Sequence, residues 1–259
     1  MSVRLLLVGG GRMGEALLGG MLAAGRPPEE LAVAEVYAPT RARLAEQYPG
    51  VRIVEAPIAA EGVVLATKPD GIADAAEACV AAGAQRLLSV AAGVTTDAIG
   101  TAVPVVRAMP NTPALVGAGV TAIAAGSSAT EADLDWAEDV LKAVGVVVRV
   151  KESQLDAVTG VSGSGPAYVF LVAEALSDAG VLAGLPRELA NTLAFQTLLG
   201  SSQLLVQSGD GPAELRAAVT SPGGTTAAGT RELERGGVRS AFLEAVMAAT
   251  ERSKELGRA

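Results

Sequence analysis

The stretch Leu5-Leu6-Leu7-Val8-Gly9-Gly10-Gly11-Arg12-Met13-Gly14 decides the fold of this chain. An apolar, strand-like run leads directly into G-x-G-x-x-G, and a helical pattern follows. In this context the first glycine makes a tight turn, the second lets the backbone approach a pyrophosphate, and the third lets helix and strand pack closely. Amides at the helix start then hold the phosphates. We therefore expect a nicotinamide or flavin dinucleotide to contact Val8, Gly9, Gly10, Gly11, Arg12, Met13 and Gly14.

Short apolar runs alternate with helical patterns from the N-terminus to about residue 150. Apolar runs without polar alternation are typical of strands that are buried on both faces. The alternation therefore predicts a mostly parallel sheet that is covered by helices on both sides. Strands are expected at Val3–Val8, Leu31–Glu35, Val51–Val54, Val63–Ala66, Arg86–Val90, Val105–Ala108, Val120–Ala124 and Val146–Val150, and helices at Met13–Ala24, Arg41–Gln47, Ile72–Ala82 and Glu131–Val144.

After Lys151 the pattern predicts helices only. Each break in this region carries Gly or Ser just before a proline, which is a helix start signal. These prolines are Pro166, Pro186, Pro212 and Pro222. The predicted fold is an α/β Rossmann-type dinucleotide-binding domain, residues 1–151, followed by an all-α helical domain, residues 152–259.

The helical domain has long apolar faces, at Tyr168–Leu182 and Leu189–Val206. A segment of this size has more hydrophobic surface than it easily buries alone. Packing against a second copy of the chain is the favoured interpretation. Packing only against the first domain is the alternative.

Charge and hydropathy exclude several classes of partner. The chain carries 20 Lys and Arg against 28 Asp and Glu, a formal net charge of −8, whereas nucleic-acid and anionic-membrane binding need basic patches. A membrane span needs about 20 consecutive apolar residues, and the longest apolar runs are broken by Lys68 and Arg149. The segment Met1–Arg4 carries no targeting pattern. We expect a cytoplasmic protein with neither nucleic acid nor membrane as a partner.

The sequence contains no histidine and one cysteine, Cys79. Without histidine there is no Ser-His or Cys-His nucleophile pair, and most zinc sites are excluded, so no metal site is expected. Cys79 lies in an alanine-rich helical pattern and is interpreted as a small buried hydrophobe. Chemistry in this chain must come from hydroxyls, carboxylates, backbone amides or a cofactor.

Glu35 ends the second predicted strand, 21 residues beyond Gly14. An acid at this place accepts hydrogen bonds from a ribose 2′-hydroxyl and favours NAD over NADP. Arg41 and Arg43 follow closely and could hold a 2′-phosphate instead, or could be solvated residues of a helix start. The sequence leaves the preference between NADPH and NADH open.

Four further segments resemble pyrroline-5-carboxylate reductases, over nearly the whole chain. Three follow predicted strands: Ala66-Thr67-Lys68-Pro69, Val90-Ala91-Ala92-Gly93-Val94-Thr95 and Arg107-Ala108-Met109-Pro110-Asn111-Thr112-Pro113. The fourth is a pair in the helical half, Asp156–Tyr168 (D-A-V-T-G-V-S-G-S-G-P-A-Y) and Ser221–Thr226 (S-P-G-G-T-T). The resemblance implies an oxidoreductase that reduces 1-pyrroline-5-carboxylate to L-proline with NADPH or NADH, the last step of proline biosynthesis.

The resemblance assigns cofactor contacts to the three segments that follow strands. Open α/β sheets bind ligands at the carboxyl ends of their strands. The implied contacts are Ala66, Thr67, Lys68, Pro69, Val90, Ala91, Ala92 and Gly93, with Asn111 orienting the nicotinamide. Lys68 reaches a ribose hydroxyl on this interpretation, and is a solvated loop lysine on the alternative one.

The resemblance assigns the substrate to two places in the helical half. A helix start at Ser221–Thr226 would offer free amides to the substrate carboxylate, and Thr226 is implied as the catalytic hydroxyl beside the ring nitrogen. Substrate contacts are implied for Ser164, Gly165, Ser221, Gly223, Gly224, Thr225 and Thr226. Ser221 at the N-cap with Pro222 at the first helical position is the structural alternative, and Ser164 and Gly165 could merely start a helix. The family also implies a homodimer, with a decamer of dimers as the larger assembly.

Two other functions fit parts of the sequence. A β-hydroxyacid dehydrogenase would carry G-x-x-G-x-G-x-x-x-K-x-x-x-N at the start of its helical domain. Gly160, Gly163 and Gly165 fit this spacing, but Val169 and Ala173 stand where the lysine and asparagine belong. A catalytically silent sensor or scaffold that binds a dinucleotide would explain the glycine loop. It would not explain the second polar helix start at Ser221–Thr226.

Overall fold

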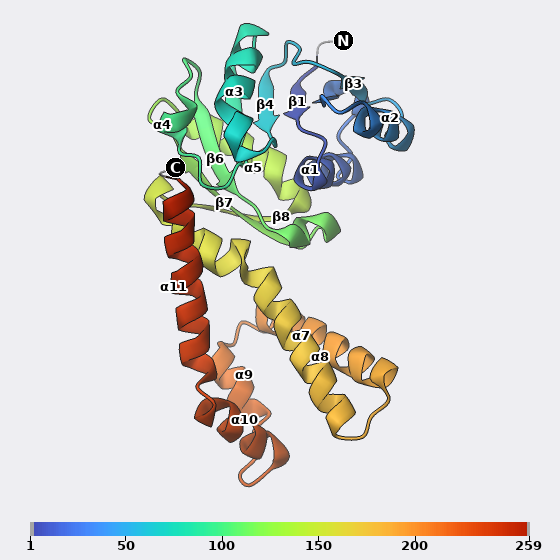
Figure 1. The fold of residues 1–259 in the computed structure, drawn as a ribbon, viewed down its shortest axis with the longest axis vertical. Helices are drawn as coiled ribbons and strands as arrows, with labels where there is room; N and C mark the ends of the chain where they lie inside the picture. The colour runs from blue at the N-terminus through green and yellow to red at the C-terminus, as the bar shows by residue number, and fades with distance from the viewer. Residues whose placement is uncertain (1–2, 258–259) are drawn as a thin grey trace. The chain divides into compact units, whose positions relative to one another are not determined.

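The computed structural model describes residues 3–257. Two predictions reach beyond this range. The segment without a targeting pattern includes Met1 and Ser2, and the helical domain includes residues 258 and 259, which lie outside the described residues. The described chain forms an eight-stranded sheet in the order β3-β2-β1-β4-β5-β6-β7-β8 (Figure 1). The strands are β1 (Leu5–Val8), β2 (Leu31–Ala34), β3 (Arg52–Val54), β4 (Gly62–Leu65), β5 (Arg86–Ser89), β6 (Val105–Met109), β7 (Gly119–Ala125) and β8 (Gly145–Arg149). All eight predicted strands are confirmed.

Both faces of the central strands β1, β2 and β4 are buried, which explains their apolar runs. In β1, Leu5 and Leu7 belong to one hydrophobic cluster, while Leu6 and Val8 belong to a second one on the opposite face. The first cluster includes residues of α1 (Arg12–Ala23), α2 (Ala38–Gln47) and α5 (Glu131–Leu141), and the second includes residues of α3 (Ile72–Ala81) and α4 (Thr96–Ile99). Short turns of helix complete the unit: η1 (Pro28–Glu30), η2 (Pro69–Gly71), η3 (Thr112–Val116), η4 (Lys142–Val144) and η5 (Glu152–Gln154).

Cys79 lies in the second cluster with 1% of its surface exposed, as predicted. Burial raises the pKa of its thiol to about 11. The thiolate that would react as a nucleophile is therefore scarce at neutral pH.

The sheet is parallel except where β6 meets β7. These two strands are joined by a short connection that holds η3 and no crossover helix. Antiparallel neighbours can be joined in this way, whereas parallel ones require a long crossover.

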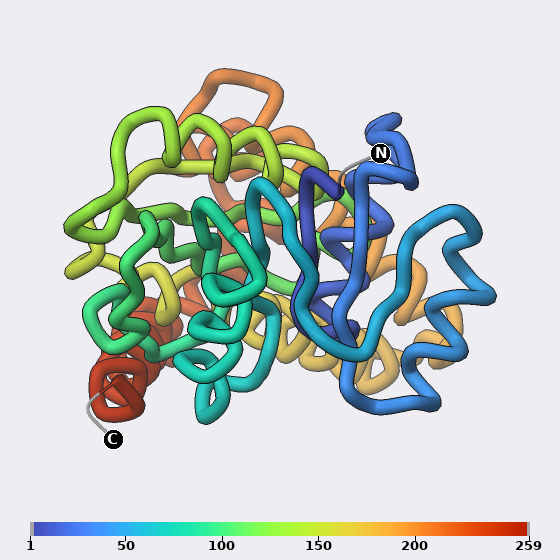
Figure 2. The backbone as a smooth tube through the Cα atoms, turned by 90° about the horizontal axis from the view of Figure 1, so that it is seen from above, coloured from blue at the N-terminus to red at the C-terminus, as the bar shows by residue number. Residues whose placement is uncertain are grey.

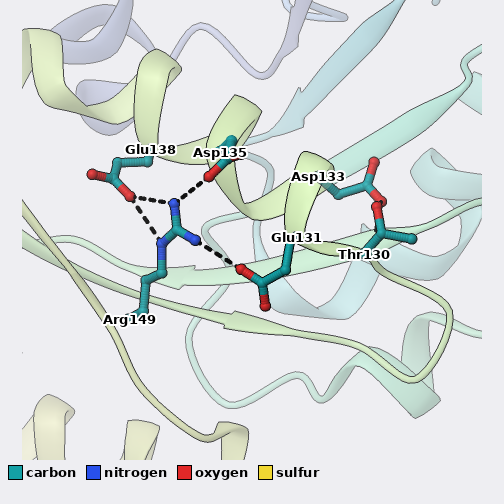
Figure 3. A network of polar contacts seen from close by, with 6 residues as sticks. All are labelled: Thr130, Glu131, Asp133, Asp135, Glu138 and Arg149. Carbon is teal, nitrogen blue, oxygen red and sulfur yellow. Dashed lines mark hydrogen bonds and ion pairs between the residues drawn. The ribbon is translucent and has the colours of Figure 1, made fainter.

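The outer strand β8 is tied to α5 by an ion network (Figure 3). The guanidinium of Arg149 donates to Glu131 at 3.0 Å, Asp135 at 2.6 Å, and Glu138 at 2.7 and 2.9 Å. The hydrogen bonds that Arg149 donates to Asp135 and Glu138 raise the pKa of its guanidinium above the ordinary value. This network is solvent-exposed, so it contributes little stability. The network also explains why the apolar run of β8 ends in a charged residue, Arg149.

The described chain contains helices only after β8. They are α6 (Leu155–Val158), a single π-helical turn η6 (Thr159–Gly163), α7 (Gly165–Leu182), α8 (Arg187–Gln207), α9 (Pro212–Ala218), α10 (Thr225–Arg235) and α11 (Val238–Leu256). The sequence did not predict the π-helical turn. Such turns are rare and frequent at functional sites.

The chain divides into two compact units. One is formed by the chain up to Ser164 together with the segment from Met247 onward, and the other is Gly165–Val246. The predicted boundary at 151/152 marks the end of the strands, but the first unit extends further. Leu155 is fully buried in it, and Ser253 donates a 2.7 Å hydrogen bond to Asp156.

Within the second unit, α7 and α8 pack closely at Gly180. A Cβ added to Gly180 would lie 3.0 Å from the Cβ of Ala190. Many large apolar side chains of both helices remain exposed. They include Val169, Phe170, Leu171, Leu176, Leu182, Leu189, Leu193, Phe195, Leu199, Leu204, Leu205 and Val206. Soluble monomers rarely expose so much contiguous apolar surface.

The same region contains one helical stretch, Glu152–Leu182, that is long and apolar enough to cross a membrane by length and composition alone. A helix that packs against another copy of the chain meets the same criterion. The finding is therefore weak support for a membrane span.

Candidate active site

The glycine loop has the backbone geometry that a dinucleotide fingerprint requires. Gly9 has a φ of +104°, and a Cβ there would lie 2.6 Å from the carbonyl oxygen of Ala66. A Cβ on Gly14 would collide with the carbonyl oxygen of Gly9. Gly11 is the N-cap of α1 with no side-chain cap, and no atom lies within 4 Å of the position of its missing Cβ. The first turn of α1 therefore has free amides beside open space, which suits a pyrophosphate.

Glu35 lies directly against this loop. Its carboxylate accepts hydrogen bonds from the amides of Gly10 and Tyr37, both at 2.8 Å. Each carboxylate oxygen keeps further lone pairs for a ribose hydroxyl. The predicted position of Glu35 at the cofactor loop thus has direct geometric support.

The two arginines that could have held a 2′-phosphate are engaged elsewhere. Arg41 donates to the carbonyls of Glu35 at 2.9 Å and Val36 at 2.7 Å. Arg43 forms two bonds to the Glu15 carboxylate, at 2.7 and 2.8 Å, and these lower the pKa of Glu15. Glu35 is therefore held against the glycine loop by its own hydrogen bond to Gly10, whereas Arg41 and Arg43 bond other protein groups.

The segment Ala66–Pro69 borders the same loop. The amide of Ala66 donates to the carbonyl of Val8 at 2.8 Å, which continues the pairing of β4 with β1. The hydroxyl oxygen of Thr67 is buried without a hydrogen-bond partner in the described structure. Lys68 is exposed and Pro69 begins η2. The Thr67 hydroxyl beside the loop can therefore form a hydrogen bond with a bound cofactor.

The strand ends that carry these motifs lie level with one another. Val8 is paired with Ala34 on one side and Leu65 on the other, and Leu65 is paired in turn with Ser89. The strand order reverses between β1 and β4, which is the switch point where open α/β sheets bind ligands. Figure 2 shows this division, with the early blue segments on one side of the sheet unit and the cyan and green segments on the other.

Asn111 and the π-helical turn hold each other in place. The Asn111 amide nitrogen donates to the carbonyl of Ser162 at 3.2 Å, and its oxygen accepts from the amide of Val120 at 3.0 Å. A Cβ on Gly163 would lie 2.6 Å from the terminal methyl of Met109. The side-chain amide of Asn111 thus uses one N–H and one oxygen lone pair in bonds within the protein. The second N–H and the second lone pair remain for a ligand.

The predicted substrate residues Ser221–Thr226 come together in a turn before α10. The amide of Gly224 donates to the carbonyl of Ser221 at 3.0 Å, and Gly223 has a φ of +70°. Pro at the second position and glycine with positive φ at the third are typical of a type II turn. Pro222 therefore belongs to the turn. The alternative with Ser221 as N-cap and Pro222 at the first helical position is wrong, because Gly224 is the N-cap.

The first turn of α10 leaves polar groups available. Its first intrahelical bond runs from the amide of Ala228 to the carbonyl of Gly224, so the amides of Thr225, Thr226 and Ala227 precede the ladder. Thr226 is half-buried and Thr225 is exposed. No other described residue forms a hydrogen bond with the Thr226 hydroxyl in this structure, whereas Thr230 donates to the Thr226 carbonyl at 2.8 Å.

The predicted cofactor residues all lie in the first unit, and Ser221–Thr226 lie in the second. Ser164 is the last residue of the first unit and follows the π-helical turn, with its amide bonded to the carbonyl of Thr159 at 2.8 Å. Gly165 begins α7. The described residues contain no group of three or more His, Cys, Asp or Glu side chains that could hold a metal ion.

The sequence motifs did not predict a polar cluster that follows the Ala91–Val94 turn, formed by Thr96, Arg107 and Glu152. Glu152 accepts from the amide and the hydroxyl of Thr96, both at 2.8 Å, and from Arg107 at 3.4 Å. Arg107 belongs to a family-like motif, but the motif predicts no role for it. An arginine inside an apolar strand was the available signal, since a buried charge requires a partner.

Two family profiles match separate parts of the chain. Residues 4–93 match the family described as NADP oxidoreductase coenzyme F420-dependent, and residues 152–256 match the family described as pyrroline-5-carboxylate reductase dimerisation. The second match covers the region with the exposed apolar helices.

Whole-chain relatives agree. The pyrroline-5-carboxylate reductase of Synechocystis is 48% identical, with 100% of both chains covered. That of Mycobacterium tuberculosis is 48% identical and covers 98% of this chain and 96% of its own.

Solved structures agree as well. The pyrroline-5-carboxylate reductase of Coxiella burnetii has a TM-score of 0.92 and 36% identity, over 99% of both chains. The pyrroline carboxylate reductase of Plasmodium falciparum, with NADP bound, has a TM-score of 0.85 and 30% identity, over 98% of both chains. With full-length relatives at this identity, the resemblance predicted from the sequence motifs is confirmed: the chain belongs to the pyrroline-5-carboxylate reductase family.

Proposed function

We propose that this protein reduces 1-pyrroline-5-carboxylate to L-proline, with NADPH or NADH as the hydride donor. One observation carries the proposal. In a chain 48% identical to a pyrroline-5-carboxylate reductase over its whole length, the glycine loop lies beside the point where the strand order reverses, and Ser221–Thr226 lead into a helix whose first amides are free.

The residues of the first unit fit a nicotinamide cofactor. The amides of Gly11, Arg12 and Met13 at the start of α1 would hold the pyrophosphate, and Glu35 would face the adenosine ribose. Ala66–Pro69, Val90–Gly93 and Asn111 would line the nicotinamide half. When bound, the reduced cofactor supplies the hydride that the imine carbon accepts.

The residues of the second unit would bind the substrate. The turn Ser221–Gly224 and the free amides of Thr225 and Thr226 offer hydrogen bonds to a single carboxylate. We assign the Thr226 hydroxyl to the ring nitrogen, where it donates a hydrogen bond as that nitrogen becomes an amine. A protonated imine is already a strong hydride acceptor, so orientation and this one donor are the protein's main contributions. This explains how the reaction proceeds in a chain without histidine.

Ser164 and Gly165 are proposed as further substrate contacts. They follow the π-helical turn whose Ser162 carbonyl accepts from Asn111. This hydrogen bond links the motif at the end of β6 with the motif at the start of α7. A change at either motif is therefore expected to affect both.

The exposed apolar faces of α7 and α8 support assembly through the region that matches the dimerisation family. We propose a homodimer and, as a larger form, a decamer of dimers. We also propose a cytoplasmic protein. The net charge of −8 supports the proposal that it binds neither nucleic acid nor membrane, and assembly accounts for the apolar surface of Glu152–Leu182.

The test is direct. Purified protein is mixed with the cyclic imine and either NADPH or NADH, and both the oxidation of the cofactor and the formation of L-proline are followed. Cofactor binding without imine-dependent oxidation would favour the sensor interpretation. Failure to bind either cofactor would refute the proposed function.

A further inference from the structure

The end of α11 packs against the turn that follows β5. A Cβ on Gly257 would lie 2.7 Å from the carbonyl oxygen of Gly93, and a Cβ on Gly93 would lie 3.4 Å from the Cβ of Leu256. Gly93 is buried and has a φ of +79°. Two glycines, more than 150 residues apart in the printed sequence, therefore meet with no room for a side chain on Gly257.

The end of α11 is itself held in place. Ser253, with 4% of its surface exposed, donates a 2.7 Å hydrogen bond to the carboxylate of Asp156 in α6. The amide of Gly257 donates to the carbonyl of Ser253 at 3.1 Å, which fixes the last turn. A hydroxyl bonded to a carboxylate in a site shielded from water is a comparatively strong interaction.

The far side of the same turn is held by the segment that leads into α6. Glu152 accepts from both the amide and the hydroxyl of Thr96, at 2.8 Å each. The turn Ala91–Val94 is therefore fixed near both of its ends: by Glu152 just beyond it, and by Gly257 at Gly93. Glu152 and Asp156 lie one helical turn apart, so the contacts form a closed ring within the first unit.

We propose that two residues in the last turn of α11, Ser253 and Gly257, are positioning residues of the cofactor site. They hold the Ala91–Val94 turn in the shape that receives the nicotinamide half of the cofactor. This inference rests on the proposed function, which assigns Val90–Gly93 to the cofactor. The residues of the α11 turn do not touch the cofactor in this proposal; they act through Gly93.

Gly257→Ala is the sharpest perturbation, because one added methyl group must displace the Gly93 carbonyl. Ser253→Ala removes the hydroxyl that bonds Asp156 and adds no atom. Asp156→Asn keeps an acceptor oxygen and serves as the conservative change for comparison with Asp156→Ala. The matched control is Glu255→Ala, since Glu255 lies in the same turn and its carboxylate accepts a hydrogen bond from the exposed Arg252.

The measurement is the Kd for NADPH, from titration of nicotinamide fluorescence without imine, together with the KM values and the unfolding temperature. A displaced binding turn is expected to raise the Kd of Gly257→Ala and Ser253→Ala about tenfold. The KM for the imine at saturating NADPH should stay unchanged. Asp156→Asn should bind more tightly than Asp156→Ala, and Glu255→Ala should match the unmodified protein.

The inference fails if Gly257→Ala and Ser253→Ala bind NADPH as tightly as the unmodified protein does. It also fails if Glu255→Ala loses as much affinity, because the effect would then be a general loss of the helix end. An unmodified protein that binds no nicotinamide cofactor would instead refute the proposed function. The two failures are therefore distinguishable.

Discussion

Thr226→Ala removes the one hydroxyl that we assign to the imine nitrogen. The change leaves the backbone of α10 intact, because the Thr226 carbonyl still accepts from Thr230. Alanine also has the higher helix propensity. The hydroxyl forms no hydrogen bond with another described residue, so its loss leaves no protein group unpaired. We therefore expect a free energy of unfolding within about 1 kcal/mol of the unmodified protein.

The expected loss of rate follows from the role of the hydroxyl. Removal of one preorganised donor in an active site costs about 2–4 kcal/mol in the transition state, which is roughly 30- to 1,000-fold in turnover. Thr226 is half-buried, so water can enter the vacated space and donate in part. This places the expected loss in the lower half of that range, at about 30- to 100-fold.

Single-turnover and steady-state kinetics with saturating NADPH measure this effect. Turnover should fall while the Kd of NADPH stays unchanged, since Thr226 is assigned to the substrate and its hydrogen bond strengthens as hydride addition returns the lone pair to the nitrogen. Thr225→Ala is the matched control, because it is the adjacent threonine of the same helical turn and is exposed. It should keep most of the activity.

Equal losses in the two variants would show that the helix start as a whole matters and that Thr226 has no special role. Full turnover in Thr226→Ala would place the donor elsewhere. Either result would refute the catalytic assignment and would leave the family membership untouched.

Three further predictions concern the cofactor, the assembly and the response to acid. Replacing Glu35 with Ser should improve the use of NADPH relative to NADH, because a carboxylate repels a 2′-phosphate; an unchanged ratio of kcat/KM values would mean that Glu35 does not face the ribose. Light scattering at micromolar concentration should show a dimer or a larger form, and a stable monomer would contradict the interpretation of the apolar faces of α7 and α8. Glu15→Gln should destabilise the fold by less than about 1 kcal/mol at neutral pH, because the Arg43 bonds lower the pKa of Glu15 below its ordinary value of 4.5. That difference should be fully present above pH 4.5 and disappear as the pH falls through the lower folded pKa; denaturant unfolding at several pH values measures it.

Local patterns in the sequence predicted much of the sheet unit. A parallel strand buried on both faces requires an apolar run, which is why β1, β2 and β4 were visible. The β8 strand was visible from its valines, although Val146 and Val148 are exposed. The glycine loop was predictable because Gly9 needs a positive φ and Gly14 tolerates no Cβ. The position of Glu35 beside the loop was predictable because β2 pairs with β1 and ends next to the loop, and its contact with the ribose stays a prediction.

The start of α10 was harder to predict. A proline after a serine is a common helix start, yet Pro222 and Gly223 form a turn and the helix begins at Thr225. The local signals for a turn and for a helix start share the same residues. The structure favours the turn, in which Gly223 has positive φ.

The sequence by itself determined the strand and helix pattern, the dinucleotide loop and the family, because each depends on residues close together in the chain or on whole motifs. Only the tertiary structure decided which distant groups meet. Asn111 bonds the carbonyl of Ser162, and Gly257 packs against Gly93. Neither contact leaves a periodic signal, since one involves a backbone carbonyl that every residue carries and the other depends on the absence of a side chain.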